Sequence, residues 1–333
     1  MNPNILQDRR KLRYDEGLAE RLNREAAELE RKGLLKVEEQ EEPEVAAPEK
    51  KTEEQFQLKK VATIKAESEV SHLCFCNSSP HIAFLDQNPS RINVSSIDHP
   101  SEIAEANKIK GSYTCLSRFN ADALGIENTL AFAAGAGQGT VEFHIIERPT
   151  MTKAGKHTIL SATIPEMKYS SIPVIASDFD GKLFAVTNCV DAHVYEISSG
   201  FLKKLKLKKR ASLCDFSFSD MSFVSDSEIA ISYLSEMTFW NTLLGPQGKI
   251  STAPLSDNLS KIAFSRSRKY MAASRGSSLK LFELNQTASP YQFTKICELK
   301  SGFQINGLDF SPNRHYLAAA CGKEIQIYSV QEK

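Results

Sequence analysis

The chain has 333 residues, of which 41% are hydrophobic and 25% charged, a composition typical of a globular protein with a large core. Its 41 basic residues balance its 41 acidic ones, so net charge selects neither nucleic acid nor an anionic membrane. The N-terminus lacks the apolar segment of a signal peptide, and no apolar run approaches the ~18–20 residues of a membrane span. Seven cysteines, an odd number, predict no disulfide framework. We expect a protein without a transmembrane segment, in the cytoplasm or, as the alternative, in the nucleus.

The N-terminal segment, residues 1–35, has the pattern of an amphipathic, coiled-coil-like helix. Small and aliphatic residues recur every seven positions from Ile5 to Ala26, and Leu22 and Leu29 fill complementary positions of the same stripe. Such a stripe needs a cover, which a second copy, a partner helix or the following domain could supply. The alternative is a partly frayed tail. We take Leu22 and Leu29 as candidate partner-binding residues.

Residues 36–55 differ from this helix in composition. They are rich in glutamate, contain Pro43 and Pro48, and have almost no bulky apolar side chains. A segment that buries so little apolar surface cannot offset the entropy that it would lose on ordering. We therefore expect a disordered acidic linker here, with a domain boundary before residue 56.

From residue 56 onwards, short strand-like runs alternate with turn signals. The clearest unit spans residues 304–330, where Ser311-Pro312-Asn313 and Gly322-Lys323 separate three runs. Similar units recur upstream at intervals of roughly forty to sixty residues, a period typical of propeller blades. The expected first strands of the five earlier units are Val70–Phe75, Tyr113–Phe119, Pro173–Phe179, Leu213–Phe218 and Lys261–Ser265.

The last unit ends without a run that could serve as its fourth strand. The run Lys59–Lys65, just after the linker, has no earlier strands to pair with. Joining these two ends closes the ring and removes the unpaired strand edges that promote aggregation. We predict an all-β propeller over residues 56–333 with six blades, or seven if the long interval between the second and third units holds another.

The repeats resemble those of the WD40-repeat β-propellers. The matching residues are Gly307–Asn313 with Tyr316–Ala319, Ile262–Ser265 with Tyr270–Ala273, and Phe239-Trp240-Asn241 at the end of a third strand. No Gly-His dipeptide opens a repeat and no Trp-Asp pair occurs, so the chain resembles a degenerate member of that family. The resemblance implies a propeller that binds protein partners.

No motif of a known catalytic or cofactor chemistry stands out. The chain lacks a nucleophile elbow, a P-loop, a His-Glu-x-x-His helix and paired Cys-x-x-Cys motifs, and its seven histidines have no spacing that suits a metal. The glycine-rich turn Gly135–Gly139 joins two expected strands, so no helix N-terminus is available there to bind a phosphate. We expect no catalytic residue, no cofactor and no metal site.

The most distinctive charged feature is a basic run that begins in an expected fourth, outermost strand over residues 202–207. Lysines on an outer strand discourage edge-to-edge pairing, or they bind an acidic segment of a partner protein. Nucleic acid and phosphoinositides are less favoured ligands. The Phe-Arg-Arg-Gly motif of phosphoinositide-binding propellers is absent, which counts against the lipid. Ser212 follows the run and fits a basophilic kinase site. The candidate binding residues are Lys203, Lys204, Lys206, Lys208 and Arg210.

The leading hypothesis from the sequence is a non-catalytic scaffold or adaptor subunit of a larger complex, which binds proteins through the propeller faces and the N-terminal helix. One alternative is a subunit like the heterotrimeric G-protein β chain, whose N-terminal helix pairs with a small helical partner. An alternative of another class is a catalytic regulator, resembling the endomembrane propellers that act as exchange factors for small GTPases.

Overall fold

The computed structural model divides the chain into two units, Met1–Lys50 and Lys51–Lys333, and every residue that it describes belongs to the second. The expected helix over residues 1–35, with Leu22 and Leu29, and the expected linker over residues 36–55 lie outside the described residues. The structure describes residues 56–76, 80–87, 90–100, 109–126, 129–147, 156–168, 172–188, 191–199, 205–213, 219–233, 236–244, 248–254, 258–285, 287, 291–312 and 316–332.

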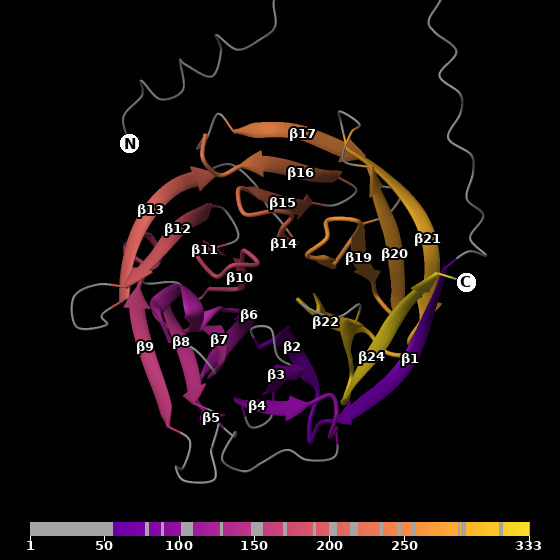
Figure 1. Cartoon of the computed structure of the whole chain (residues 1–333), viewed down its shortest axis with the longest axis horizontal. Coiled ribbons are helices and arrows are strands. Elements are labelled where there is room, and N and C mark those ends of the chain that lie inside the picture. Colours follow the sequence, from indigo (N-terminus) through magenta and orange to yellow (C-terminus); the bar gives the residue numbers. More distant parts are fainter. Residues whose placement is uncertain are drawn as a thin grey trace, which may run out of the picture. The chain divides into compact units, whose positions relative to one another are not determined.

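The described residues form six four-stranded antiparallel sheets, which stand around a common axis as the blades of a propeller (Figure 1). This arrangement confirms the prediction of an all-β propeller with six blades. From the axis outwards, the first three blades are blade 1, with β2 (Val70–Phe75), β3 (His81–Gln87), β4 (Ser90–Ser96) and β5 (Ile109–Lys110); blade 2, with β6 (Tyr113–Arg118), β7 (Thr129–Ala136), β8 (Thr140–Glu147) and β9 (His157–Thr163); and blade 3, with β10 (Val174–Ser177), β11 (Leu183–Thr187), β12 (Ala192–Ser199) and β13 (Leu205–Leu213). The other three are blade 4, with β14 (Asp220–Phe223), β15 (Glu228–Tyr233), β16 (Glu236–Asn241) and β17 (Lys249–Pro254); blade 5, with β18 (Lys261–Phe264), β19 (Tyr270–Arg275), β20 (Ser278–Asn285) and β21 (Gln292–Lys300); and blade 6, with β22 (Ile305–Phe310), β23 (Tyr316–Cys321), β24 (Glu324–Glu332) and β1 (Phe56–Lys65).

Helical structure is nearly absent from the part of the chain that the structure describes. It consists there of two short 3-10 turns, η3 (Ala121–Leu124) and η4 (Pro165–Met167). The side chain of Asn120 caps η3 by accepting a hydrogen bond from the backbone N–H of Asp122 at 3.0 Å. Within the described residues, no helix is long and apolar enough to cross a membrane.

The last blade is completed by the first strand of the propeller. β1 pairs antiparallel with β24, from Phe56 opposite Glu332 to Lys65 opposite Glu324. Figure 1 shows the two strands side by side, indigo against yellow, although they lie at opposite ends of the described sequence. The closing strand predicted from the sequence, Lys59–Lys65, lies in this segment, and β1 begins three residues earlier.

One strand predicted from the sequence is wrong. The innermost strand of blade 4 is β14, Asp220–Phe223, rather than Leu213–Phe218, and Leu213 is the last residue of β13 in the preceding blade. Met221 and Phe223 of β14 are buried in a cluster that joins blades 3 and 4. The later segment forms the inner strand because its apolar face is buried against the neighbouring sheet. Such burial depends on tertiary contacts, which the local sequence pattern does not reveal.

The core lies between neighbouring blades, where the faces of two sheets pack against each other. Phe75 and Phe84 of blade 1, for example, share one buried cluster with Ile325 and Ile327 of blade 6. The middle strand of blade 6 contributes Ala318 to the same cluster, and so small a side chain lets the sheets approach closely. Each buried phenylalanine or isoleucine contributes about 1.5–3 kcal/mol relative to leaving it exposed. Packing of blade on blade therefore stabilises the ring and fixes the innermost strands around the axis.

Candidate functional site

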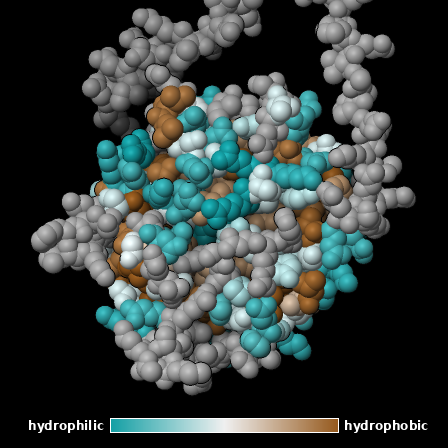
Figure 2. Space-filling view, in the orientation of Figure 1, coloured by the Kyte–Doolittle hydropathy of each residue, from teal (hydrophilic) through white to brown (hydrophobic). Residues whose placement is uncertain are grey.

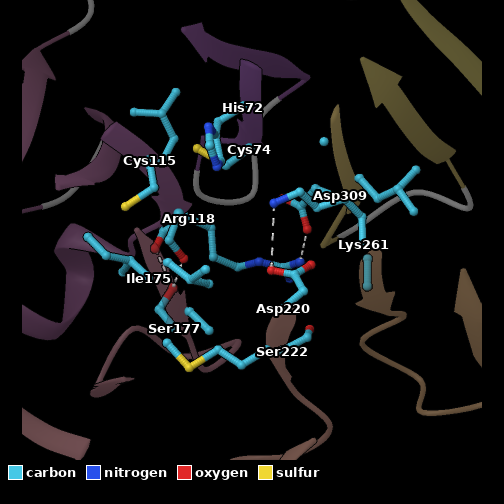
Figure 3. A pocket seen from close by; sticks show the side chains of 18 of the residues that line it. His72, Cys74, Cys115, Arg118, Ile175, Ser177, Asp220, Ser222, Lys261 and Asp309 are labelled. Carbon is cyan, nitrogen blue, oxygen red and sulfur yellow. Dashed lines mark hydrogen bonds and ion pairs between the residues drawn. The ribbon is translucent and has the colours of Figure 1, made fainter. Parts of the chain in front are cut away.

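A small cavity lies on the axis of the propeller, where the innermost strands of the six blades converge. Its volume is about 70 Å³, enough for a few ordered water molecules. Pockets that enclose a small-molecule ligand are larger, at roughly 300–1,000 Å³. The polar and nucleophilic side chains of its wall are His72, Cys74, Cys115, Ser117, Arg118, Ser177, Asp220, Ser222, Lys261 and Asp309 (Figure 3).

Asp309 of β22 is bonded to two blades other than its own. Its Oδ2 accepts a hydrogen bond of 2.8 Å from the backbone N–H of Phe75 in β2, and its Oδ1 forms an ion pair with Nη2 of Arg118 in β6. Figure 3 shows the Arg118 side chain crossing the cavity towards Asp309. The guanidinium carbon also lies 4.8 Å from the ring centroid of Phe179, within the range of a cation–π interaction. Burial raises the pKa of Asp309, and the charge of Arg118 opposes that rise.

Asp220, at the start of β14, makes a similar link between blades 4 and 5. Its Oδ2 accepts a hydrogen bond of 2.9 Å from the backbone N–H of Ile262, and its Oδ1 lies 3.9 Å from Nζ of Lys261. Burial raises the pKa of Asp220, and the charge of Lys261 opposes that rise. In the cavity, the charge of Asp309 is therefore balanced by Arg118 and that of Asp220 by Lys261.

His72 of β2 is a neutral imidazole in this cavity. Burial, with a smaller contribution from the charge of Lys261, lowers its pKa to about 3. Nδ1 of His72 and Nη1 of Arg118 are both buried without a hydrogen-bond partner among the described residues. Water is the usual partner of such groups, and the cavity has the volume for it.

The nucleophilic side chains of the cavity are not activated. Burial raises the pKa of the Cys74 thiol well above its ordinary value and that of Cys115 to about 12, whereas a reactive cysteine needs a lowered pKa. The hydroxyls of Ser117 and Ser177 lie 3.1 Å apart and hydrogen-bond to each other. Within the described ranges, no three His, Cys, Asp or Glu side chains are grouped so that they could hold a metal ion. The cavity is a polar centre that ties the blades together.

A larger hollow, of about 400 Å³, opens beside the turn between β23 and β24. The segments that lead into β2 and β22 form its sides, and backbone hydrogen bonds hold both in place. The N–H of Val70 donates to the carbonyl of Gly322 at 2.8 Å, and the N–H of Ile305 donates to the carbonyl of Gly276 at 2.9 Å. The hollow is lined by Glu69, Phe303, Gln304, Cys321, Gly322, Lys323 and Glu324.

Phe303 forms an aromatic wall of this hollow and is 60% exposed. Its backbone is fixed by Ser301, whose hydroxyl accepts a hydrogen bond from the N–H of Phe303 at 3.2 Å and donates one to its carbonyl. The ring rests on the β23–β24 turn, since a Cβ added at Gly322 would lie 3.4 Å from it. An ordered aromatic ring in the wall of a hollow is a typical anchor point for a ligand.

Two adjacent leucines project from the turn between β16 and β17. Leu243 is 68% exposed and Leu244 is 64% exposed, and Figure 2 shows a brown projection at the upper left, over this turn. The turn itself is ordered by hydrogen bonds. Oδ1 of Asn241 accepts from the N–H of Leu243 at 2.9 Å, and both the N–H and the hydroxyl of Thr242 donate to the carbonyl of Ser227, at 2.8 and 3.0 Å. The two leucines are thus presented to solvent on a fixed backbone.

The basic run predicted from the sequence is described only in part. Lys203 and Lys204 lie outside the described residues, and for Lys206 the structure gives only its place in β13. Lys208 and Arg210 are exposed on β13, which is the outermost strand of blade 3. The structure therefore places these two residues on the rim of the propeller.

Two basic residues of β13 form ion pairs with nearby glutamates of the propeller. Arg210 pairs with Glu196 of β12, and Lys209 pairs with Glu166 of η4. The Glu166 carboxylate also accepts a hydrogen bond of 2.6 Å from the hydroxyl of Tyr195. Burial alone would raise the pKa of Glu166, but the hydrogen bonds from Lys209 and Tyr195 bring it to about 2.

Ser212, the candidate phosphorylation site, lies one residue before the end of β13 and is half-buried. Its hydroxyl is 3.1 Å from Nδ1 of His193 on the neighbouring strand β12. Burial lowers the pKa of His193. The hydroxyl is thus part of the sheet's own hydrogen bonding, and its phosphorylation stays a prediction.

Sequence reasoning did not single out Arg118, Phe303 or the leucine pair. Arg118 is a charged residue inside the expected strand Tyr113–Phe119, and this was the available signal for a paired charge in the core. Phe303 stands between Gly302 and Gln304, and the leucines stand just before a Gly-Pro dipeptide, so all three are bulky apolar residues in turns. Turns are usually polar, so these apolar residues were the available signal in the sequence.

Comparison of the sequence with known proteins gives no relative from which a function could be transferred. No model of a known protein family matches the chain, and no curated protein matches it. The fold established by the structure, a six-bladed β-propeller, and the chemistry of its surface are therefore the basis for assigning a function.

Proposed function

We propose that this chain is a non-catalytic interaction scaffold of the WD40-like type, an adaptor subunit that binds protein partners through the surface of its propeller. The observation that carries the proposal is the exposed pair Leu243 and Leu244 on an ordered turn. We place the protein in the cytoplasm.

The leucine pair favours a protein partner for energetic reasons. Full burial of a leucine side chain contributes about 1.5–3 kcal/mol relative to exposure, so covering both would supply several kcal/mol of binding free energy. Because hydrogen bonds from Asn241 and Thr242 already order the turn, little further entropy is lost when a partner docks. The pair is therefore suited to a docking contact with an apolar surface of a protein partner.

Two further features support a scaffold. Propellers are commonly protein-binding, and the repeats around Asp309 and Phe264 resemble those of the WD40 family. The axial cavity, at about 70 Å³, has little room for a substrate, and its charges are bonded within the ring. Binding is therefore assigned to the outer surface, including the exposed lysines of β13, for which an acidic segment of a partner is the proposed ligand.

The test compares partners of the full chain with those of the double variant Leu243→Asp, Leu244→Asp by affinity purification at matched expression. Ile159→Asp is a matched control, since Ile159 is an exposed aliphatic residue on the outer strand β9. We expect a set of proteins that co-purifies with the wild type and with the control but not with the double variant. The melting temperatures should agree closely, because surface substitutions typically change stability by less than about 0.5 kcal/mol. An unchanged set of partners would contradict the proposal.

A further inference from the structure

The hollow beside Phe303 differs from the leucine turn because it combines an aromatic wall with carboxylates. We propose that it binds an extended segment of a protein partner in which an apolar side chain stands next to an arginine or lysine. The inference rests on the proposed scaffold function and names the chemistry that one surface of the scaffold recognises.

The size and rigidity of the hollow fit a side-chain anchor. Its volume of about 400 Å³ lies within the roughly 300–1,000 Å³ typical of ligand sites, whereas the axial cavity is far smaller. Phe303 is held by Ser301 and rests on the turn at Gly322. Phe303 is therefore already ordered before a partner binds, so less conformational entropy is lost on binding.

The charges of the hollow select a cation. Glu69 accepts a hydrogen bond from the amide of Asn306 at 3.0 Å, and Glu324 accepts one from the amide of Gln326 at 3.3 Å. Both donors are neutral, and neither carboxylate forms an ion pair with another described residue. Among the described residues of the lining, Lys323 is the one cation, so their formal charge is −1, from two carboxylates and one ammonium group.

An arginine or lysine of a partner satisfies both parts of this surface. Its charged group can pair with Glu69 or Glu324, and its position over the exposed Phe303 ring would add a cation–π interaction of about 0.5–1 kcal/mol. The aliphatic stem of such a side chain, or a neighbouring apolar residue, can cover the ring itself. A phosphate-bearing ligand such as a nucleic acid or an anionic lipid would be repelled by the same carboxylates.

Recognition in this hollow falls to side chains. Gly322 and Lys323 line the hollow, and their carbonyls already accept hydrogen bonds from the N–H groups of Val70 and Ala66, at 2.8 and 2.9 Å. A partner strand therefore finds no free carbonyl in this turn to extend the sheet, and the contacts that remain are apolar and ionic. This favours a short motif with defined side chains over the addition of a β-strand.

The experiment is a selection of displayed random peptides on the full chain, followed by affinity measurement of the enriched peptides. We expect enriched sequences to carry Arg or Lys within two positions of Leu, Ile, Met or Phe. Phe303→Ser should weaken their binding by about tenfold or more. Glu69→Gln combined with Glu324→Gln should weaken it as well and reduce its dependence on salt. Glu236→Gln, at an exposed glutamate of β16, is the matched control and should leave binding unchanged.

Each other outcome has a defined meaning. Enriched peptides without a basic residue, binding that survives Phe303→Ser, or no enrichment over that variant would overturn the inference. The double variant at Leu243 and Leu244 separates this result from the wider proposal. Peptides of the hollow should still bind that variant, whereas partners that depend on the leucine pair should still bind Phe303→Ser. A negative result for the hollow would therefore not contradict a positive result for the leucine pair, and the reverse also holds.

Discussion

Arg118 of blade 2 reaches across the axis of the propeller to pair with Asp309 of blade 6, although blade 1 stands between them. The same aspartate bonds to the backbone of blade 1 through Phe75, so one carboxylate ties three consecutive blades. Most buried hydrophobic clusters of the described residues join two neighbouring blades, and this ion pair adds a link that passes over blade 1.

Breaking the pair should destabilise the whole ring. Both side chains are largely buried, so Arg118→Met leaves an uncompensated carboxylate, and we expect a loss of about 3–5 kcal/mol in the free energy of unfolding. The double variant with Asp309→Asn should lose less than the sum of the two single variants, because the pair is then removed as a unit. Urea unfolding followed by circular dichroism measures both. Lys295→Met, at the exposed pair with Glu298, is the control and should cost less than about 1 kcal/mol.

Closure by β1 predicts a sharp boundary for truncation. Deleting residues 1–50 should leave a folded propeller, whereas deleting residues 1–66 removes β1 and exposes the edge of β24 along its whole length. The longer deletion should abolish the cooperative thermal transition, because blade 6 then loses its outermost strand and the contacts of Phe56 and Leu58. A cooperative melt that is the same for both truncated proteins would rule out a structural role for β1.

The buried His144 should make the propeller sensitive to acid. Burial, with a smaller contribution from His157, lowers its pKa to about 3, while Glu142 lies 3.3 Å from its Nε2 without reversing this shift. Between pH 6.5 and about 3 the unfolded state binds a proton that the folded state does not, so stability should fall as pH falls through this window. The slope is at most about 1.4 kcal/mol per pH unit for one histidine.

The variant His144→Phe tests this assignment. Phenylalanine can keep the stack with Phe132, whose ring centroid lies 4.9 Å from that of His144, but it does not titrate. Unfolding free energies measured from pH 7 to pH 4 should fall less steeply for the variant than for the wild type. Because His72 also has a pKa near 3, some pH dependence should remain. Equal slopes for the two proteins would show that His144 does not contribute.

The basic run of residues 203–210, part of which lies in β13, should bind acidic peptides, and the glutamate-rich residues 36–49 should compete for it. Charge reversal of Lys203, Lys204, Lys206 and Lys208 should weaken binding of a synthetic Glu-rich peptide and flatten its salt dependence. Deleting residues 36–49 should strengthen binding at low salt, since a tethered segment can reach a millimolar effective concentration. Exposed pairs contribute only about 0–1 kcal/mol each, so the effect should vanish at high salt. Unchanged affinity after the deletion would favour edge protection as the role of the lysines.

The repeat architecture could be predicted from the sequence because each blade carries its own turn signals and its own alternation. The innermost strand of blade 4 could not, because Asp215-Phe216-Ser217 mimics the motif Asp309-Phe310-Ser311 of the last blade. The segment that the fold uses begins at Asp220, whose carboxylate bonds to the backbone of Ile262 in the next blade. Contacts of this kind form between blades of the closed ring, so no local sequence pattern predicts them.

Of the candidate sites, the basic run could be predicted from the sequence and the hollow could not. The basic run was visible because its residues are consecutive, and the structure places Lys208 and Arg210 on the rim as a strand of that position requires. The hollow was not visible, because Glu69 comes from a segment that is more than two hundred residues away from Phe303 in the chain. Only the closing of the ring brings the two together.

Ring closure also makes the propeller slow to assemble on the ribosome. The hydrogen bond between Phe75 and Asp309 spans 234 residues, and at about 5–20 residues per second the second partner is synthesised roughly ten to fifty seconds after the first. During that time β1 has emerged but has no strand to pair with, and the apolar face of blade 1 that will meet blade 6 has no cover. The nascent chain therefore passes through an open-ring stage in which chaperones are best placed to bind, and substitutions in β24 should reduce yield in cells more than they reduce the stability of the finished protein.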